Sequence, residues 1–269
     1  MSGLRLADFH SHLVPGVDDG SRTLEDAMEG IGRMIEAGVD RIITTPHFQG
    51  SATKDPVRLA AELQRMDEGW ALVQEAVQEE WPDVDFRRGH EVLLDIPDPD
   101  LSDDRLHLGG TTSILVEWPR FQVPPGTAQV LEEIVGAGLT PVVAHPERYS
   151  GIDAQLHVVR HWKATGALLQ ANYGSLVGRY GPGPRALVLR MLSEGLLDYL
   201  STDFHGRPHL EPLIDEAREA MVDMGGEVVF ELLAAVNPGR LFDGQPPLPV
   251  PPVVPEPTLL ERIRSWISG

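Results

Sequence analysis

Asp8-Phe9-His10-Ser11-His12 sets the pattern from which the rest of this chain can be interpreted. It follows Leu4-Arg5-Leu6-Ala7, where apolar and polar residues alternate as in a β-strand with one buried face. Two histidines at i and i+2 lie on one face at the end of such a strand, so both imidazoles can point at one metal ion. A lone His-x-His pair is more often two unrelated surface histidines. The metal interpretation therefore depends on similar strand ends elsewhere.

Such strand ends recur along the chain. The sequence predicts strands at residues 4–7, 41–45, 85–89, 113–116, 140–144, 167–171 and 198–202. Potential metal ligands stand just after all but one of them, at His10, His12, His47, Glu91, Glu117, His145, Asp203 and His205. Scattered core or surface histidines would not be expected to choose one edge of a sheet repeatedly.

Segments with helical spacing of apolar residues separate these strands. Thr23 and Asp26 have the spacing of a capping box, and Asp55-Pro56 is an N-cap followed by proline at the first helical position. The predicted helices cover residues 24–37, 56–80, 127–137, 153–165, 184–194, 210–224 and 227–235. About seven strands alternating with helices predict an α/β fold whose parallel sheet closes, or nearly closes, into a barrel. Functional residues in such folds lie at the C-terminal ends of the strands.

Composition limits the possible functions. The 269 residues suffice for one large α/β domain, and the net charge of −19 argues against nucleic acid as a partner. The chain has no cysteine, which excludes disulfides and a cysteine nucleophile. The sequence shows neither a signal peptide nor a run of apolar residues long enough to span a membrane. We therefore expect a cytoplasmic protein.

The candidate ligands are too many for one ion. Eight side chains gather at the strand ends, and Asp18 or Asp19 in the loop after the first strand could return to them as a ninth. Carboxylates such as Glu91 and Glu117 can bridge two ions, which then lie roughly 3.5 to 4 Å apart. These features predict a multinuclear hydrolase. The remaining histidines are interpreted as structural or solvated; they are His90, His107, His157, His161 and His209.

These motifs together resemble the polymerase and histidinol phosphatase (PHP) superfamily. The resemblance covers residues 4 to about 240 and rests on the first His-x-His motif with Asp18-Asp19-Gly20, and on Thr45-Pro46-His47, Gly89-His90-Glu91, Val116-Glu117, His145-Pro146-Glu147-Arg148 and Thr202-Asp203-Phe204-His205. More narrowly, Glu117 and the His-Pro-Glu-Arg run resemble the bacterial metal-dependent protein-tyrosine phosphatases of capsule and exopolysaccharide gene clusters.

The resemblance implies a distorted (β/α)7 barrel of the PHP type with three divalent ions, usually manganese, with iron or zinc as alternatives. By motif, the ions would be held by His10, His12, Glu91 and Asp203; by Glu91, Glu117 and His145; and by His47, His205 and either Asp18 or Asp19. The resemblance also assigns Arg148 and Arg207 to the substrate phosphate. The loop that carries Arg207 is shorter here than in such relatives.

The resemblance implies hydrolysis of phosphotyrosine in a protein, and the implied substrate is a bacterial tyrosine kinase of capsule or exopolysaccharide synthesis. A phenol has a pKa of ~10, so an aryl phosphate can depart with little help from a general acid. Four aromatic residues near the strand ends could stack on the substrate ring: Phe48, Trp118, Phe121 and Phe204. A small-molecule phosphatase, such as one acting on histidinol phosphate, and a non-catalytic phosphotyrosine-binding scaffold are the alternatives.

The end of the chain differs from the rest in composition. Residues 1–243 are assigned to the barrel, which is expected to close near Asn237-Pro238, and residues 244–269 to a proline-rich linker and a short amphipathic helix. Prolines from Gln245 to Pro257 predict an extended spacer outside the barrel. The helix, expected at residues 258–267, could pack back on the barrel or dock to a partner kinase or, weakly, to a membrane surface.

Overall fold

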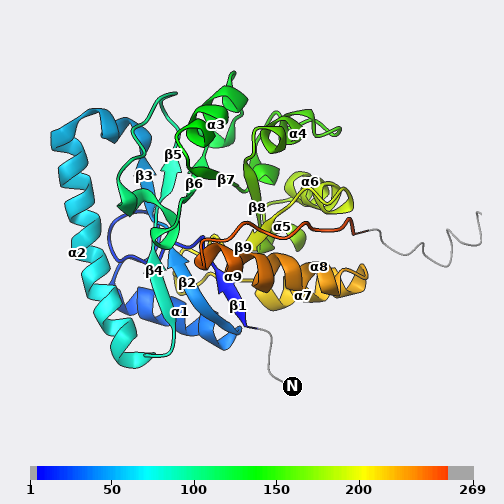
Figure 1. Ribbon diagram of the computed structural model, residues 1–269. Coiled ribbons are helices and arrows are strands. Elements are labelled where there is room, and N and C mark those ends of the chain that lie inside the picture. Colours follow the sequence, from blue (N-terminus) through cyan, green and yellow to red (C-terminus); the bar gives the residue numbers. More distant parts are fainter. Residues whose placement is uncertain (1–4, 254–269) are drawn as a thin grey trace, which may run out of the picture.

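The computed structural model describes residues 5–253, in which short parallel strands alternate with helices (Figure 1). The strands are β1 (Leu6–Asp8), β2 (Val39–Thr44), β3 (His47–Gln49), β4 (Asp85–Arg88), β5 (Glu91–Leu93), β6 (Ser113–Glu117), β7 (Thr140–Ala144), β8 (Leu168–Asn172) and β9 (Tyr199–Ser201). All the strand pairs are parallel, in the orders β1-β2-β4 and β3-β5-β6-β7-β8-β9. The predicted α/β class with parallel sheets is confirmed.

Two breaks in the strands divide the sheet. Thr45-Pro46 separates β2 from β3, and Gly89-His90 separates β4 from β5. Backbone hydrogen bonds continue across the breaks, since the amide of Gly89 donates to the carbonyl of Thr44 at 2.9 Å and the amide of Glu91 to that of Pro46 at 3.1 Å. Proline cannot donate a ladder hydrogen bond, so a break at Pro46 is expected physically. Sequence reasoning missed both short strands beyond the breaks.

The two outer strands, β1 and β9, approach each other at their C-terminal ends. Ser11 and Phe204 form an isolated parallel bridge. The amide of His12 donates to the carbonyl of Phe204, and the amide of Asp203 donates to the carbonyl of His10, both at 2.8 Å. The first and last strands therefore deliver their candidate ligands to one place.

Helices surround the strands. They are α1 (Leu24–Glu36), α2 (Pro56–Glu80), α3 (Thr127–Gly136), α4 (His157–Ala164), α5 (Tyr173–Leu176), α6 (Pro182–Ser193), α7 (Ile214–Asp223), α8 (Glu227–Glu231) and α9 (Asn237–Phe242). The predicted caps form: the hydroxyl of Thr23 accepts from the amide of Asp26, and the carboxylate of Asp55 accepts from the amides of Val57 and Arg58. Both helices consequently begin where the sequence places them.

Most of the strands are buried on both faces, whereas β3 and β4 are partly exposed. Neighbouring residues such as Ile42 and Ile43, or Val142 and Val143, belong to two different apolar clusters, one between strands and helices and one on the opposite face. Strands covered on both faces carry continuous apolar runs rather than an alternating pattern. Phe242 of α9 belongs to the same cluster as Ile43 and Val142, so α9 packs against the face of the strands that carries those two side chains.

Some predicted helix boundaries are wrong. Helix α4 begins at His157 rather than at Asp153, because Leu156 has a left-handed backbone (φ 58°), and α7 begins at Ile214 because Leu213 does too (φ 58°). The chain also stays helical past Asn237-Pro238: a π-helical stretch, Leu232–Val236, leads into α9, whose first turn accommodates the proline.

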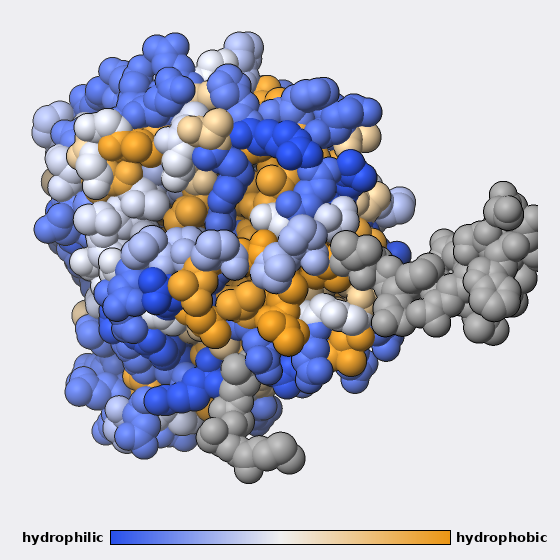
Figure 2. All heavy atoms as spheres, turned by 45° about the vertical axis from the view of Figure 1, so that its right-hand side comes forward, coloured by the Kyte–Doolittle hydropathy of each residue, from blue (hydrophilic) through white to orange (hydrophobic). Residues whose placement is uncertain are grey.

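The described part of the proline-rich segment, residues 244–253, is extended but lies on the body. The side-chain amide of Asn237 makes reciprocal hydrogen bonds with the backbone of Leu248, at 3.0 and 2.8 Å. The amide of Val253 donates to the carbonyl of Leu192 at 2.9 Å, and the Val253 side chain is buried. Figure 2 shows apolar surface between the two ends of the described chain. The helix expected at residues 258–267 lies outside the described residues.

Within residues 5–253, no helix combines the length and the apolar character needed to cross a bilayer.

Candidate metal centre

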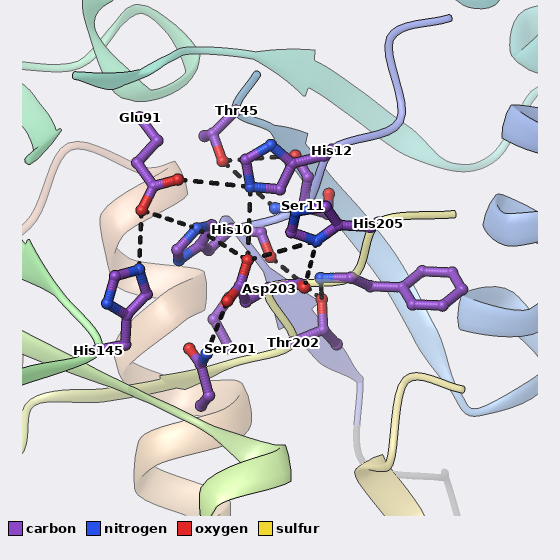
Figure 3. A network of polar contacts seen from close by, with 12 residues as sticks. His10, Ser11, His12, Thr45, Glu91, His145, Ser201, Thr202, Asp203 and His205 are labelled. Atoms are coloured by element: carbon purple, nitrogen blue, oxygen red, sulfur yellow. Dashed lines mark hydrogen bonds and ion pairs between the residues drawn. The ribbon is translucent and has the colours of Figure 1, made fainter. Parts of the chain in front are cut away.

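The ligand candidates from distant parts of the chain meet in one cluster. Figure 3 shows part of it, with His10, His12, Glu91, His145, Asp203 and His205 turned toward one another. Most come from the last residue of a strand or from the residues just after it, because the C-terminal ends of parallel strands share an edge. His47 and Glu91 are the first residues of β3 and β5, directly after the breaks, and Asp19 comes from the loop after β1. Most members are buried, with His47 and Asp19 the more exposed ones. Ligand atoms lie within 4.8 Å of one another in four overlapping groups: His12, Asp19, His47 and His205; His10, Glu91 and His145; His10, His12 and Asp203; and His47, Glu91 and Glu117.

The two neighbouring loop aspartates occupy different positions. An oxygen of Asp19 lies 3.3 Å from Nε2 of His47 and 3.4 Å from Nε2 of His205, so Asp19 belongs to the cluster. Asp18 instead accepts from Nδ1 of His12 at 2.7 Å and from the backbone amide of His47 at 3.0 Å. Asp18 therefore orients two candidate ligands, while Asp19 faces the ligand atoms themselves.

Inward-facing polar atoms in the cluster lack hydrogen-bond partners among the described residues. They include Nε2 of His10, Nε2 of His12 and Oε2 of Glu91, all buried. The other ring nitrogens are occupied, since Nδ1 of His10 lies 2.8 Å from the side-chain oxygen of Gln170 and Nδ1 of His12 pairs with Asp18. Leaving buried polar atoms without hydrogen-bond partners costs free energy. In metal-binding histidines, one ring nitrogen is held by a hydrogen bond and the other is available to the ion, which is the arrangement of His10 and His12. The residues thus fit a bound divalent cation.

The histidines and carboxylates of the cluster shift one another's pKa values. Burial alone would raise the pKa of Glu91, yet the surrounding imidazoles, first among them His10, hold that pKa well below its usual range. Burial alone would lower the pKa of His12, but the carboxylate of Asp18 holds it well above the ordinary value. The pKa of Asp203 is likewise lowered, against burial, by His10 and its neighbours. The carboxylates of Glu91 and Asp203 therefore stay ionised, which is the form that binds a metal ion.

Two members of the cluster have unusual backbone conformations. His145 (φ 33°) and Asp203 (φ 51°) are non-glycine residues in the left-handed region. Such a conformation costs an L-residue roughly 1–2 kcal/mol and occurs preferentially at functional sites. Hydrogen bonds hold both turns, because the amide of Arg148 donates to the carbonyl of His145 and the amide of Asp203 to that of His10.

Arg148 lies at the side of the cluster in a fixed position. Its Nη1 donates to Oδ2 of Asp203 at 2.5 Å. The guanidinium carbon lies 4.3 Å from the ring centres of both Phe121 and Tyr180, so the side chain is held between two aromatic rings. Arg148 and Tyr180 also line a cavity of about 140 Å³ that includes Asp203 and His205. This places a cation beside the candidate metal ligands.

Arg207 is held less firmly. Its guanidinium donates to the backbone carbonyl of Asp19, with Nε at 3.0 Å. The loop that carries Arg207 is fixed by Arg33 of α1, which donates to the carbonyls of Arg207, Pro208 and Leu210. Both predicted arginines therefore reach the region of the cluster, but Arg207 through a loop that depends on a third arginine.

Several supporting residues were not anticipated from the sequence. Gln170 contacts His10, and Asn172 donates to Oδ2 of Asp203 at 2.8 Å. Asp8 accepts from the hydroxyl of Ser201 and the amide of Thr202, and burial raises its pKa to about 6. Gln170 and Asn172 alternate on β8, a period-2 polar pattern in a buried strand that could have identified them.

The histidines interpreted as structural or solvated lie outside these groups. Nδ1 of His90 contacts the carbonyl of Arg105 at 2.9 Å, and burial lowers the pKa of His90 to about 4. His107 contacts the carbonyl of Leu101 at 2.8 Å, while His157 is exposed beside Asp153.

A larger groove of about 470 Å³, between residues 97–102 and α3, is lined by residues other than the candidate ligands.

Fold and site together define a parallel α/β protein with a cluster of side chains that could hold metal ions, gathered around the C-terminal ends of its strands. The family described as capsular polysaccharide synthesis, CpsB/CapC, matches residues 6–243. The chain belongs to that family.

Relatives of known sequence support this membership. The tyrosine-protein phosphatase YwqE of Bacillus subtilis (strain 168) is 29% identical over 202 residues, which cover 74% of this chain and 77% of YwqE. The tyrosine-protein phosphatase CpsB of Streptococcus pneumoniae is 24% identical over 250 residues, covering 89% of this chain and 99% of CpsB.

Solved structures agree. One similar chain comes from the crystal structures of YwqE from Bacillus subtilis and CpsB from Streptococcus pneumoniae, which are described as unique metal-dependent tyrosine phosphatases. It matches with a TM-score of 0.73 and 25% identity, and the match covers 93% of this chain and 99% of that one. A phosphotriesterase homology protein from Escherichia coli has a TM-score of 0.51 at 15% identity, covering 90% of this chain and 99% of its own, and shares the fold alone.

Proposed function

We propose that this protein is a metal-dependent phosphomonoester hydrolase, and specifically a protein-tyrosine phosphatase. The observation that carries the proposal is a set of buried ligand atoms of His10, His12 and Glu91 that have no hydrogen-bond partner within residues 5–253. They lie beside the fixed guanidinium of Arg148. Family membership and the resemblance to YwqE and CpsB support the same activity. Since the chain has no cysteine, a cysteine nucleophile is excluded.

The proposal includes three divalent ions, with manganese favoured over iron or zinc. Their ligands would be His10, His12, Glu91 and Asp203 for the first; Glu91, Glu117 and His145 for the second; and His47, His205 and Asp19 for the third. The close groups described above support the first and third sets, since they join His10, His12 and Asp203, and His47, His205 and Asp19. For the second set they pair Glu91 with His145 in one group and with Glu117 in another, next to His47. Bound divalent cations lower the pKa of water and neutralise charge on phosphoryl oxygens.

The protein's own residues have distinct roles in this proposal. Arg148 binds the substrate phosphate, since its guanidinium is fixed at the cavity shared with Asp203 and His205. Arg207 provides a second, weaker contact. Arginine suits this role because its planar fork matches phosphate oxygens. The tyrosine leaving group has a pKa of ~10, so the reaction needs little help from a general acid.

We further propose that the strands form the distorted seven-stranded barrel expected from the sequence. If β2 with β3 and β4 with β5 each count as one interrupted strand, the nine short strands become seven. The bridge between Ser11 and Phe204 supports contact between the first and last of them.

The proposed substrate is a phosphotyrosine protein, and the family's link to capsular polysaccharide synthesis favours a bacterial tyrosine kinase of that system, acting in the cytoplasm. The alternatives are a small-molecule phosphatase and a non-catalytic scaffold. The complete set of clustered ligands argues against the scaffold.

One assay separates these functions. The protein with added Mn²⁺ is given a phosphotyrosine peptide, the matching phosphoserine peptide and histidinol phosphate. We expect kcat/KM to be highest for the phosphotyrosine peptide. A preference for histidinol phosphate would support the small-molecule phosphatase, and binding of the phosphotyrosine peptide without turnover would support the scaffold.

A further inference from the structure

We infer that Phe121 is the specificity residue that contacts the aromatic ring of the substrate and favours aryl over alkyl phosphates. The inference rests on the proposed function and concerns the same site. It begins with the exposure of the aromatic side chains near the strand ends. Phe48, Trp118 and Phe204 are 1–2% exposed and pack in the core, whereas Phe121 is 39% exposed. Among these four, Phe121 alone offers substantial surface to a ligand.

Phe121 is also placed beside the chemistry. Its ring centre lies 5.5 Å from that of His145, a candidate metal ligand, with the planes inclined at 61°. The guanidinium carbon of Arg148 lies 4.3 Å from the ring centre. A phosphate held by Arg148 would therefore bring its ester substituent near Phe121. Aromatic rings attract one another at centre distances of about 4.5–7 Å, beyond what burial of area alone provides.

The backbone holds Phe121 in this place at a conformational cost. Arg120 (φ 59°) and Phe121 (φ 49°) are two consecutive non-glycine residues in the left-handed region. Ser150 stabilises the turn, because its backbone amide and its hydroxyl both donate to the carbonyl of Phe121, at 2.8 and 3.0 Å. Two strained residues that present a half-exposed ring next to the cluster are typical of a functional position rather than of packing.

Phe121 could instead act only by holding Arg148, whose guanidinium contacts both Phe121 and Tyr180. These roles differ in what they affect. A ring that contacts the substrate ring helps aryl phosphates alone. A ring that only positions Arg148 helps every phosphate, including inorganic phosphate, to the same extent.

The test compares Phe121→Leu with wild type, both loaded with Mn²⁺. Measured quantities are kcat/KM for phosphotyrosine and for phosphoserine peptides of the same sequence, and the inhibition constant of inorganic phosphate. We expect kcat/KM for phosphotyrosine to fall about three- to tenfold, while the inhibition constant of phosphate changes less than about twofold. Phe121→Tyr should restore the phosphotyrosine value. Phe86→Leu, at a ring that packs on Trp70, is the matched control and should leave the aryl preference unchanged.

Other outcomes overturn the inference. Equal losses for phosphotyrosine and inorganic phosphate would show that Phe121 acts through Arg148. Unchanged kinetics in Phe121→Leu would show that the ring has no role in substrate choice. Circular dichroism of each variant checks that the fold is retained. A wild-type protein that does not hydrolyse phosphotyrosine would refute the proposed function itself, which is a separate result.

Discussion

The turns after β7 and β9 are built alike but hold their arginines differently. Each places a non-glycine residue, His145 or Asp203, in the left-handed region, and each carries an arginine a few residues later. Arg148 is fixed by two aromatic rings and by Asp203. Arg207 contacts a backbone carbonyl, on a loop tied down by Arg33. Arg148 is therefore held by three other segments, including the turn after β9, whereas the position of Arg207 depends on Arg33 of α1.

Removal of metal should produce the largest effect, because both turns converge on the same cluster. Chelation is expected to abolish hydrolysis of an aryl phosphate, while iodoacetamide leaves it intact since the chain lacks cysteine. Glu91→Gln should lower kcat/KM at least about a hundredfold and reduce metal content, measured by elemental analysis.

His90→Gln is the matched control for that change, because His90 precedes Glu91 but contacts the carbonyl of Arg105 instead of the cluster. Its metal content should equal that of wild type. If His90→Gln alone emptied the site, or if activity survived exhaustive chelation, the metal assignment would be wrong.

Arg148→Ala should give the next largest effect. Loss of a fixed, charge-assisted phosphate contact is expected to cost on the order of 1.5–3 kcal/mol, or about 10- to 150-fold in kcat/KM. Arg148→Lys should recover only part of this, because an ammonium lacks the planar fork and stacks poorly between Phe121 and Tyr180. Steady-state kinetics and metal analysis test the prediction. Wild-type kinetics in Arg148→Ala would refute the role in phosphate binding.

Arg207→Ala is expected to have a smaller effect, about two- to tenfold in kcat/KM, because its guanidinium is more exposed and less constrained. Arg33→Met should mimic part of this loss by releasing the loop carbonyls. In a double-mutant cycle the two changes should be clearly non-additive, since Arg33 acts through the position of Arg207. Additive losses would show that Arg33 does not position that loop.

Removal of the C-terminal segment is expected to have the smallest effect on catalysis, because this segment packs on α6 and α9 rather than on the two turns. Removal of residues 254–269 should change turnover of a small aryl phosphate less than about twofold and weaken action only on the intact protein partner. Removal of residues 244–269 also deletes the contacts of Leu248 and Val253, and should lower Tm by roughly 5–10 °C. Equal melting temperatures for both truncations would contradict the role of these contacts in stability.

The amino-acid sequence alone determined the class of fold and most of the candidate site. Helix signals such as Asp55-Pro56 are local, because a cap and its amides lie within a few residues. The candidate ligands could be found because every parallel strand presents its C-terminal end at the same edge. The position of a residue such as Glu117 or His145 relative to its strand was therefore sufficient to predict that the two would meet.

Only the tertiary structure distinguished residues with the same local sequence signal. Asp18 and Asp19 are adjacent carboxylates in one loop, and contacts with His12, His47 and His205 give them different positions. The aromatic candidates were equivalent until packing buried all but Phe121. These distinctions depend on contacts between segments far apart in the chain, and such contacts exist only once the strands have assembled.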